Sequence, residues 1–319
     1  MGKRWEKLVS GEVNRVLSLL EAKGVERQRA LALLLEMGAR ALLPLYEALP
    51  GLGYPPVADG EALEDASRLS SPGGGPSPEE FLRELLGARG LEVVSLSTPT
   101  PRDDILDGLA WEMGPNARLL IPFLRVAKQS LNKGTGGYLF LGKLPPEEVN
   151  TLVPLLRKLH QYGLMESFYY DNREKRLSFR ITQVGVVQQF LVGDWMERYV
   201  ARLASHLLGP EATVFRGMKV RFPWGGEGEL DVLVLRSGRI DLWVEVKTGL
   251  YMDRIARYQE IRKLLDLPKE RALMAVLEEE AETVRAQSLI LDYSILRLED
   301  LEGHLKEVVL PAPLEASQG

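Results

Sequence analysis

Residues 229–249 have the sequence ELDVLVLRSGRIDLWVEVKTG, and this stretch decides the fold of the C-terminal part of the chain. Two short runs rich in Val, Leu and Ile, 230–235 and 240–246, are separated by Ser237-Gly238. Such runs on either side of a Ser-Gly pair are typical of two antiparallel strands joined by a tight turn. We therefore predict a buried hairpin.

Three charged residues interrupt these apolar strands. Asp231 lies near the start of the first strand, and Glu245 and Lys247 lie near the end of the second. These two ends are neighbours in an antiparallel pair, so the three charges should meet at one edge of the sheet. Side chains alternate along a strand, so Glu245 and Lys247 share one face, with Val244 and Val246 opposite. Buried charges are costly unless they pair or bind something, which leaves a metal and phosphate site or a structural salt bridge.

Length and composition indicate an ordinary globular protein of two or three domains. The chain has 319 residues, of which 45% are hydrophobic and 27% charged, so it has enough apolar residues to form a core. It has no apolar run long enough for a membrane span, so we expect no membrane partner. The N-terminal MGKRWEKLVSGEV lacks the apolar centre of a signal peptide, and we therefore expect a cytoplasmic protein.

The supply of reactive side chains narrows the possible chemistry. The chain has no cysteine, which excludes disulfides, thiolate metal sites and a cysteine nucleophile. Its three histidines, His160, His206 and His304, are far apart in sequence, which argues against a histidine metal cage or a Ser-His-Asp triad. Carboxylate chemistry is therefore favoured. The net charge of −5 provides no general attraction to nucleic acid, so any such binding needs a local basic patch.

The N-terminal third of the chain contains no catalytic motif. Gly73-Gly74-Gly75 does not form a phosphate-binding loop, because no Gly-Lys-Ser/Thr follows it and no strand precedes it. Ser77 and Pro78 predict the start of a short helix over 79–87, and a strand is expected over 91–97. From these patterns we predict a helical region over 1–50, a Pro/Gly/Ser-rich linker over 51–78, and a small α/β piece of unknown role over 79–115.

Residues 116–190 show the element order of a winged helix-turn-helix. A helix over 146–162 ends at Gly163, and a hairpin (164–170 and 175–181) and a further helix from about 182 follow. The stretch DNREKRLSFRITQVG resembles the wing and following helix of that DNA-binding superfamily. Six basic and three acidic residues occur between 157 and 180, which would suit phosphate contacts. The candidate nucleic-acid-binding residues are Arg173, Lys175 and Arg176. Dimerisation or packing alone is the alternative role.

Residues 193–308 are expected to form the last domain, before a tail over 309–319. An amphipathic helix over 193–208 is followed by a strand over 213–222 and by the hairpin of residues 229–249. A helix over 252–266, a strand over 271–277, a helix over 278–290 and a strand over 293–298 follow. The order is therefore α-β-β-β-α-β, with a further α-β pair, and the overall class is α/β (α+β over the whole chain).

This order, with Asp early in one strand and Glu-x-Lys late in the next, resembles the PD-(D/E)XK nucleases, the restriction-endonuclease-like superfamily. Asp231 is followed by thirteen residues and then by Glu245-Val246-Lys247. The usual Pro before the Asp is replaced by Leu230. The resemblance covers roughly 193–300, about a third of the chain.

The resemblance implies a role for each motif residue. Asp231, Glu245 and the Val246 carbonyl would hold Mg²⁺ or Mn²⁺, which prefer oxygen ligands. Lys247 would orient or deprotonate a water, or stabilise developing negative charge. Glu197, on the preceding helix, matches an extra acidic ligand of many members. Gln259 matches a polar position that some members use near the active site.

A closer resemblance is to CRISPR-ancillary nucleases activated by cyclic oligoadenylate. In these, a winged helix leads into a G-x-W-x-E helix, as GDWMERYV (193–200) follows residues 116–190 here. They also carry an N-terminal Rossmann-like sensor with several strands, whereas residues 1–115 are expected to be mostly helical with one clear strand. The resemblance thus does not extend to that region, and a cyclic oligonucleotide activator is a weaker expectation than the nuclease itself.

The sequence therefore leads to a metal-dependent nuclease that hydrolyses phosphodiester bonds in DNA or RNA, in defence (CRISPR-associated or restriction-like) or repair. Two alternatives stay open. One is a non-catalytic winged-helix protein that binds nucleic acid or regulates, on a degenerate nuclease fold. The other is a scaffold in a defence or repair complex, docked through its N-terminal helices. A homodimer is an open arrangement, because many members of the superfamily pair their sites.

Overall fold

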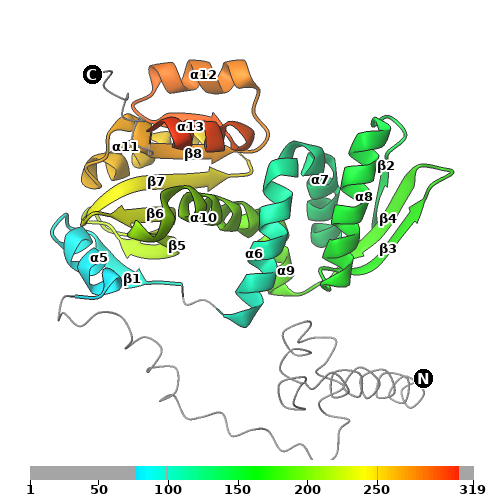
Figure 1. Cartoon of the computed structure of the whole chain (residues 1–319), viewed down its shortest axis with the longest axis horizontal. Coiled ribbons are helices and arrows are strands. Elements are labelled where there is room, and N and C mark those ends of the chain that lie inside the picture. Colours follow the sequence, from blue (N-terminus) through cyan, green and yellow to red (C-terminus); the bar gives the residue numbers. More distant parts are fainter. Residues whose placement is uncertain (1–75, 98–99, 250, 309–319) are drawn as a thin grey trace, which may run out of the picture. The chain divides into compact units, whose positions relative to one another are not determined.

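The computed structural model describes residues 76–97, 100–249 and 251–308 (Figure 1). The predicted helical region 1–50, nearly all of the linker 51–78 and the tail 309–319 lie outside the described residues. Within the described part, helices surround a six-stranded sheet and a three-stranded sheet, which confirms the predicted α/β class. No helix of this part is long and apolar enough to cross a membrane.

The six-stranded sheet has the order β1-β5-β6-β7-β8-β9. The first four strands are antiparallel to their neighbours, whereas β7, β8 and β9 run parallel. The predicted hairpin is the pair β6–β7 at the centre of this sheet, where strands are apolar on both faces. The strands are β1 (Glu92–Ser95), β5 (Ala212–Arg221), β6 (Glu227–Arg236), β7 (Arg239–Lys247), β8 (Ala272–Val276) and β9 (Ser294–Arg297).

The turn of the hairpin has the backbone that its residues predict. Ser237 and Gly238 have φ angles of 51° and 70°. Positive φ at both central residues defines a type I′ turn, whose twist matches that of the flanking strands. The predicted hairpin is confirmed.

The pairing of β5 with β6 is interrupted at Gly217, directly opposite Asp231. Arg216 pairs with Val232 and Met218 pairs with Leu230, and between them stands Gly217 with a φ of +60°. That backbone conformation favours glycine, because a side chain there collides with the following carbonyl.

Replacing Gly217 by alanine is expected to destabilise the protein by roughly 1–3 kcal/mol. Besides the positive φ, an added Cβ would lie 3.1 Å from Glu229 Oε1 and 3.1 Å from Ser97 Oγ. Urea unfolding measures the change. Gly303→Ala is the matched control, since nothing lies within 4 Å of an added Cβ at this helical position. It should stabilise by roughly 0.5–1 kcal/mol. Equal effects of the two substitutions would contradict the account of Gly217.

Helices cover both faces of the six-stranded sheet. One face packs on α10, which carries the buried Trp195, and the other packs on α5, α11 and α12. Ser77 caps α5 through its hydroxyl, 3.2 Å from the N–H of Glu80, and Pro78 is its first residue, as predicted. These helices are α5 (Pro78–Gly87), α10 (Trp195–Leu208), α11 (Ile255–Leu264), α12 (Ala281–Ile290) and α13 (Leu301–Val308).

The three-stranded sheet has the order β2-β4-β3 and packs one face on helices. The predicted order of helix, Gly163, hairpin and returning helix is confirmed, and the sequence prediction missed β2. At the hairpin turn, Asp171 Oδ1 accepts hydrogen bonds from the N–H groups of Arg173 (2.8 Å) and Glu174 (3.1 Å). The elements are α6 (Pro101–Met113), α7 (Ala117–Lys133), β2 (Gly137–Phe140), α8 (Pro146–Gln161), β3 (Met165–Asp171), β4 (Arg176–Ile181) and α9 (Gly185–Gln189).

One continuous apolar core joins the two sheets. It runs from Leu177 and Phe179 of β4 through α7 and α10 to Val232 and Val244 of the hairpin. Between α9 and α10, residues Phe190–Asp194 form a π-helical turn, a feature that often occurs at functional sites. This turn leads directly into the first turn of α10, which carries Glu197.

Candidate active site

The three motif residues meet at one end of the hairpin, as the sequence predicts. Lys247 Nζ lies 2.6 Å from Glu245 Oε1 and 3.4 Å from Asp231 Oδ2. The carboxylates are deeply buried, since Asp231 is 6% exposed and Glu245 is 3% exposed. The ammonium therefore bridges two carboxylates that have little access to water.

Asp231 also replaces a backbone carbonyl in the sheet. The ladder between β6 and β7 runs from the turn as far as Val232 and Val244. Beyond that pair, the N–H of Val246 donates to Asp231 Oδ2 at 2.8 Å. The N–H and carbonyl of one strand residue point to the same side. The Val246 carbonyl is therefore directed toward Asp231, where a ligand oxygen would be needed.

Glu245 has one oxygen that no side chain or backbone group satisfies within the described part. Its Oε1 accepts from Lys247, whereas Oε2 is buried and has no hydrogen-bond partner. A buried carboxylate oxygen without a partner is rare, because its lost hydration costs roughly 1–3 kcal/mol or more. This orphaned atom is a natural position for a cation.

Glu197 lies close enough to the motif for its charge to be felt there. Burial raises the pKa of Glu197 to about 8, and the negative charges of Asp231, Asp194 and Glu229 act in the same direction. Arg216 opposes them. The structure thus brings the third predicted acidic residue to the same edge of the sheet.

The pKa values of the clustered side chains are shifted because several buried carboxylates lie near a single ammonium. Burial raises the pKa of Glu245 to about 8, with the charge of Asp231 adding to it and that of Lys247 opposing it. Burial also raises the pKa of Asp231, although Lys247 acts to lower it. For Lys247 burial acts to lower the pKa, but the two carboxylates overcome it and hold the pKa above its ordinary value. The lysine therefore keeps its proton, and the surplus of negative charge is relieved by protons or by another cation.

This charge surplus has a consequence for stability. Glu197 and Glu245 titrate near pH 8 when folded and near their ordinary value of 4.5 when unfolded, so the folded state binds more protons between these pH values. The free energy of unfolding should therefore fall by at least roughly 3 kcal/mol, the contribution of one such group, as the pH rises from about 5.5 to 8.5 without divalent metal. Thermal melts in EDTA measure it. The same slope in Glu197→Gln would contradict the assignment.

An aromatic wall encloses the lysine on one side. The Tyr258 ring centroid lies 5.6 Å from Lys247 Nζ, and Tyr258 packs against Trp243 and Tyr293. Tyr293 donates its hydroxyl to the Leu273 carbonyl at 2.9 Å. These rings exclude water from the cluster, which strengthens its electrostatic interactions. Tyr258 thus contacts the lysine of the motif.

Gln259 is half-buried on α11, next to Tyr258. Among the described side-chain hydrogen bonds, none joins Gln259 to Asp231, Glu245 or Lys247. Its proposed place near the active site stays a prediction.

The basic residues Arg173, Lys175 and Arg176 lie at the turn of the β3–β4 hairpin and are exposed. Lys175 has a φ of 50°, and its Nζ donates to Asn172 Oδ1 at 2.7 Å. These residues belong to the three-stranded sheet, whereas the acidic motif belongs to the six-stranded sheet (Figure 1). Their binding role stays a prediction.

An ion-pair network beside Glu197 was not predicted from the sequence. Arg198, 6% exposed, bonds Asp103 at 2.5 Å, Asp107 at 2.6 Å and Asp194 at 2.6 Å. Arg216 of β5 also bonds Asp194, at 2.5 Å. The network ties α6 and β5 to the first turn of α10, so it fixes the backbone from which Glu197 projects.

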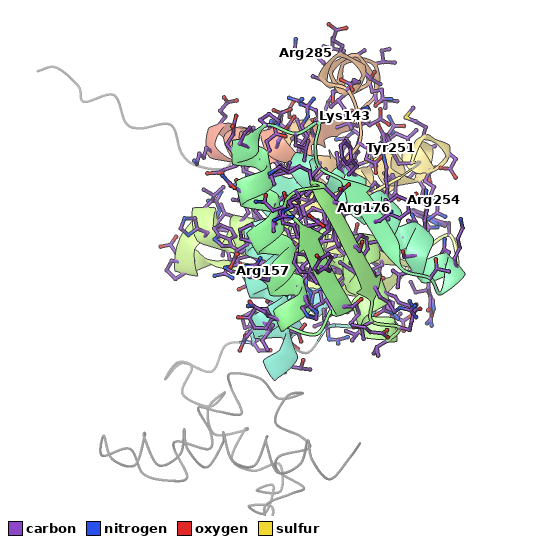
Figure 2. The ribbon with its side chains drawn as sticks, turned by 90° about the vertical axis from the view of Figure 1, so that its right-hand side faces the viewer. Lys143, Arg157, Arg176, Tyr251, Arg254 and Arg285 are labelled. Carbon is purple, nitrogen blue, oxygen red and sulfur yellow. The ribbon has the colours of Figure 1, made fainter. Side chains whose placement is uncertain are left out.

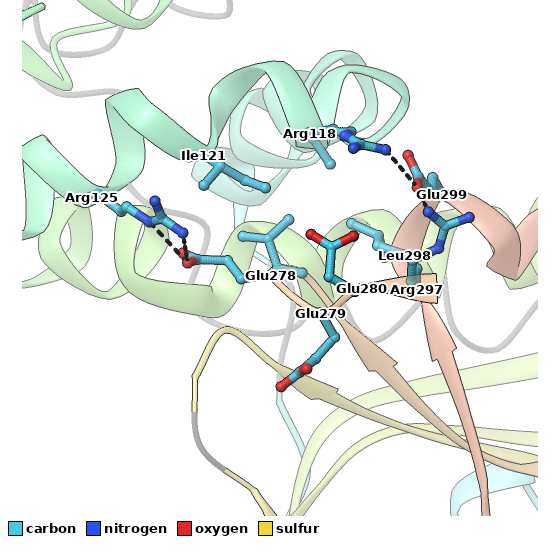
Figure 3. Close-up of a pocket in the computed structure, with 11 residues that line it drawn as sticks. Arg118, Ile121, Arg125, Glu278, Glu279, Glu280, Arg297, Leu298 and Glu299 are labelled. Carbon is cyan, nitrogen blue, oxygen red and sulfur yellow. Dashed lines mark hydrogen bonds and ion pairs between the residues drawn. The ribbon is translucent and has the colours of Figure 1, made fainter. Parts of the chain in front are cut away.

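A hollow of about 140 Å³ lies beside α7, lined by residues of α7 and of the loops next to β8 and β9 (Figure 3). None of the motif residues lines it. Its charges pair with each other: Arg125 with Glu278 at 2.5 Å, Arg118 with Glu299 at 3.6 Å, and Arg297 with Glu299 at 2.5 Å. This hollow is a joint between α7 and the six-stranded sheet and is not the candidate active site.

Two solved structures share this fold. Protein VC1899 from Vibrio cholerae matches with a TM-score of 0.50 and 19% identity, over 75% of this chain and 64% of that protein. Can2 from Sulfobacillus thermosulfidooxidans, determined in complex with cyclic tetra-adenylate, matches with a TM-score of 0.51 and 13% identity, over 73% and 61%. The chain therefore spans less than two thirds of either protein. Comparisons with protein-family models and with curated proteins give no match.

Proposed function

We propose that the chain is a divalent-metal-dependent nuclease that hydrolyses phosphodiester bonds in DNA or RNA. The observation that carries the proposal is the buried cluster in which Asp231 and Glu245 share the single ammonium of Lys247, with Glu197 close enough to feel the charge of Asp231. If all four groups are ionised, two negative charges are left uncompensated. A dication would neutralise them, and scissile phosphates need such positive charge.

The donor set fits Mg²⁺ or Mn²⁺. These ions take oxygen ligands, and Mg²⁺ often binds through only one or two carboxylates plus waters and substrate phosphate. Asp231, Glu245 Oε2 and the Val246 carbonyl would supply the protein oxygens, with Glu197 completing the set directly or through water. No three acidic or histidine side chains among the described residues already form a metal-binding group. The carboxylates would therefore have to come closer together to hold a metal.

The bound ion would polarise the phosphoryl oxygen and acidify a coordinated water. The chain's own residues would do the rest. Lys247 keeps its proton, which favours stabilisation of the charge that develops on the phosphate over a role as general base. The N–H of Val246 fixes the Asp231 carboxylate at 2.8 Å, so this ligand needs little reorganisation. Trp243, Tyr258 and Tyr293 exclude water from one side.

The resemblance of residues 116–200 to CRISPR-ancillary nucleases is our reason for placing this activity in defence. Can2 is described with cyclic tetra-adenylate bound, so a cyclic oligonucleotide is a reasonable activator to test here. We propose a cyclic oligonucleotide as the trigger and a homodimer as the active arrangement. Restriction-like or repair roles are tested by the same cleavage experiments.

The test is a cleavage panel on the full-length protein. Plasmid, single-stranded DNA and RNA are incubated with Mg²⁺, Mn²⁺, Ca²⁺ or EDTA, each with and without cyclic tetra-adenylate. We expect cleavage of at least one substrate with Mg²⁺ or Mn²⁺ and none in EDTA. A preparation carrying Lys247→Ala controls for contaminating nucleases. Intact substrates throughout, or equal cleavage by both preparations, would refute the proposal.

The second candidate is a non-catalytic, nucleic-acid-binding protein on the same fold. It is favoured by the short bond between Lys247 and Glu245, which is a complete ion pair without a metal. In that case a gel shift should be lost when Arg173, Lys175 and Arg176 are neutralised, with no metal-dependent cleavage of any substrate.

A further inference from the structure

The outer face of the three-stranded sheet carries three large aromatic side chains in water, and Figure 2 views the molecule from the side of this sheet. Tyr138 is 65% exposed, Phe140 is 62% exposed and Tyr169 is 65% exposed. The residues that alternate with them and point to the other face of the sheet, such as Leu139 and Leu177, are buried against the helices. Rings on the solvent face of a sheet are not needed for its core, and their clustering suggests an interaction surface.

The strand register places these rings together. Tyr138 and Tyr169 are the two cross-strand neighbours of Ser178, one on each side, and Phe140 is the neighbour of Arg176. Paired residues share a face and have Cβ atoms roughly 5 Å apart. The small Ser178 side chain therefore lies in a row between two tyrosine rings. The face offers flat apolar surfaces side by side.

Arginines alternate with the rings on the same face. Arg176, Ser178 and Arg180 are the exposed residues of β4. The Arg176 guanidinium stands 5.0 Å above the centre of the Tyr138 ring. Neither Arg176 nor Arg180 forms a salt bridge to a carboxylate within the described part of the chain. Asp171 is the acidic neighbour of Arg176 across the strands, and its Oδ1 already accepts from two turn N–H groups.

We propose that this face, defined by Tyr138, Phe140, Tyr169, Arg176 and Arg180, binds single-stranded nucleic acid by stacking unpaired bases on its rings. Aromatic side chains on an open sheet, with arginines for the phosphates, are what unpaired strands require, because each base has an exposed π-face. A duplex keeps those faces stacked inside the helix, so it cannot use the rings. The free positive charges make a nucleic acid the better match than an apolar protein partner.

This inference rests on the proposed nuclease function, because it names single-stranded nucleic acid as the substrate of that nuclease. The surface lies on the three-stranded sheet, whereas the acidic cluster lies on the six-stranded sheet. It would therefore hold the strand and would not touch the scissile phosphate. Its binding can be measured without any cleavage.

The experiment is fluorescence anisotropy with the full-length protein in EDTA. The probes are labelled oligo(dT) and oligo(U) of about 30 nucleotides, long enough to cover several stacking positions, and a duplex of equal length. Truncating all three rings in Tyr138→Ala/Phe140→Ala/Tyr169→Ala should weaken binding to the single strands by at least about 30-fold, since each stacked base typically contributes about tenfold. Binding to the duplex should change less than about twofold. The oligo(dT) and oligo(U) arms separate DNA from RNA.

Two variants keep the result independent of folding. Tyr162→Ala is the matched control, because Tyr162 is 50% exposed but lies at the end of α8 and outside the sheet. It should leave binding unchanged. Tyr169→Trp should retain binding, because stacking needs only a ring, whereas Tyr169→Ala should lose about tenfold. Thermal melts confirm that each variant is folded.

Several outcomes would overturn the proposal. One is a folded triple variant that binds both single-stranded probes within about twofold of the wild-type protein. Another is a triple variant that loses only self-association, which would make the face a dimer contact. If Lys247→Ala abolishes cleavage but the triple ring variant binds single strands as tightly as the wild type, this inference fails and the proposed nuclease function stands. If the rings control binding but no substrate is cleaved with any metal, the proposed nuclease function fails and the binding surface stands.

Discussion

Replacing Lys247 by alanine is expected to lower kcat for nucleic-acid cleavage roughly 100- to 1000-fold, the usual loss when one stabiliser of transition-state charge is removed. The KM for long substrates should change little, because the ammonium lies among buried carboxylates and not on an exposed binding face. Without the ammonium, Glu245 and Asp231 should retain protons to higher pH, so the variant needs a higher pH or more Mg²⁺ to recover binding of the metal.

The matched control is Lys306→Ala. Lys306 is exposed on α13 and, within the part of the chain that the structure describes, forms an ion pair with Glu302, at 2.6 Å. Its loss should leave kcat unchanged. Steady-state kinetics on the best substrate of the cleavage panel, at several pH values and Mg²⁺ concentrations, measures both variants. If Lys247→Ala retains the kcat of the wild-type enzyme, Lys247 has no role in catalysis.

The largest effect on stability is expected from Arg198. Arg198→Leu should cost roughly 3–5 kcal/mol, the usual penalty for removing one partner of a buried ion pair. The reason is that Asp103, Asp107 and Asp194 would then lose the buried guanidinium that bonds all three of them. The melting temperature should fall by about 10 °C.

Differential scanning calorimetry checks this result against Arg157→Leu. Arg157 is exposed on α8, and no ion pair ties it to another described residue. That substitution should move the melting temperature by no more than a degree or two. Arg198→Lys should also lose stability, since an ammonium cannot bond three carboxylates with the fork of a guanidinium. An unchanged melting temperature in Arg198→Leu would mean that the ion-pair network does not contribute to stability.

Local patterns predicted the hairpin well. Ser237-Gly238 specifies its own turn, and the apolar runs on either side specify the strands, so no distant information was needed. The same alternation placed Glu245 and Lys247 on one face, and the structure has them in contact at 2.6 Å. The short strand β2 was missed because its four residues lie between two helices and have no flanking strand pattern.

Long-range pairings could not be predicted in this way. Strand β1 joins the six-stranded sheet through pairs such as Glu92 with Arg221, which are far apart along the chain. Arg198 on the amphipathic helix gives no local sign of being buried, because two of its three acidic partners lie 95 and 91 residues earlier. The exposed rings of Tyr138 and Tyr169 come from two strands that meet only through β4.

The apolar core that runs from β4 through α10 to the hairpin implies that the described part melts as one cooperative unit. The three-stranded sheet has no apolar core separate from this one, whereas the six-stranded sheet has a second core on its other face. A calorimetric scan should show a single transition for residues 76–308, with equal calorimetric and van't Hoff enthalpies. The three-stranded sheet should not be obtainable alone as a folded fragment. In evolutionary terms, the three-stranded sheet and the acidic cluster must then be inherited together, because a recombination point between them would expose this core.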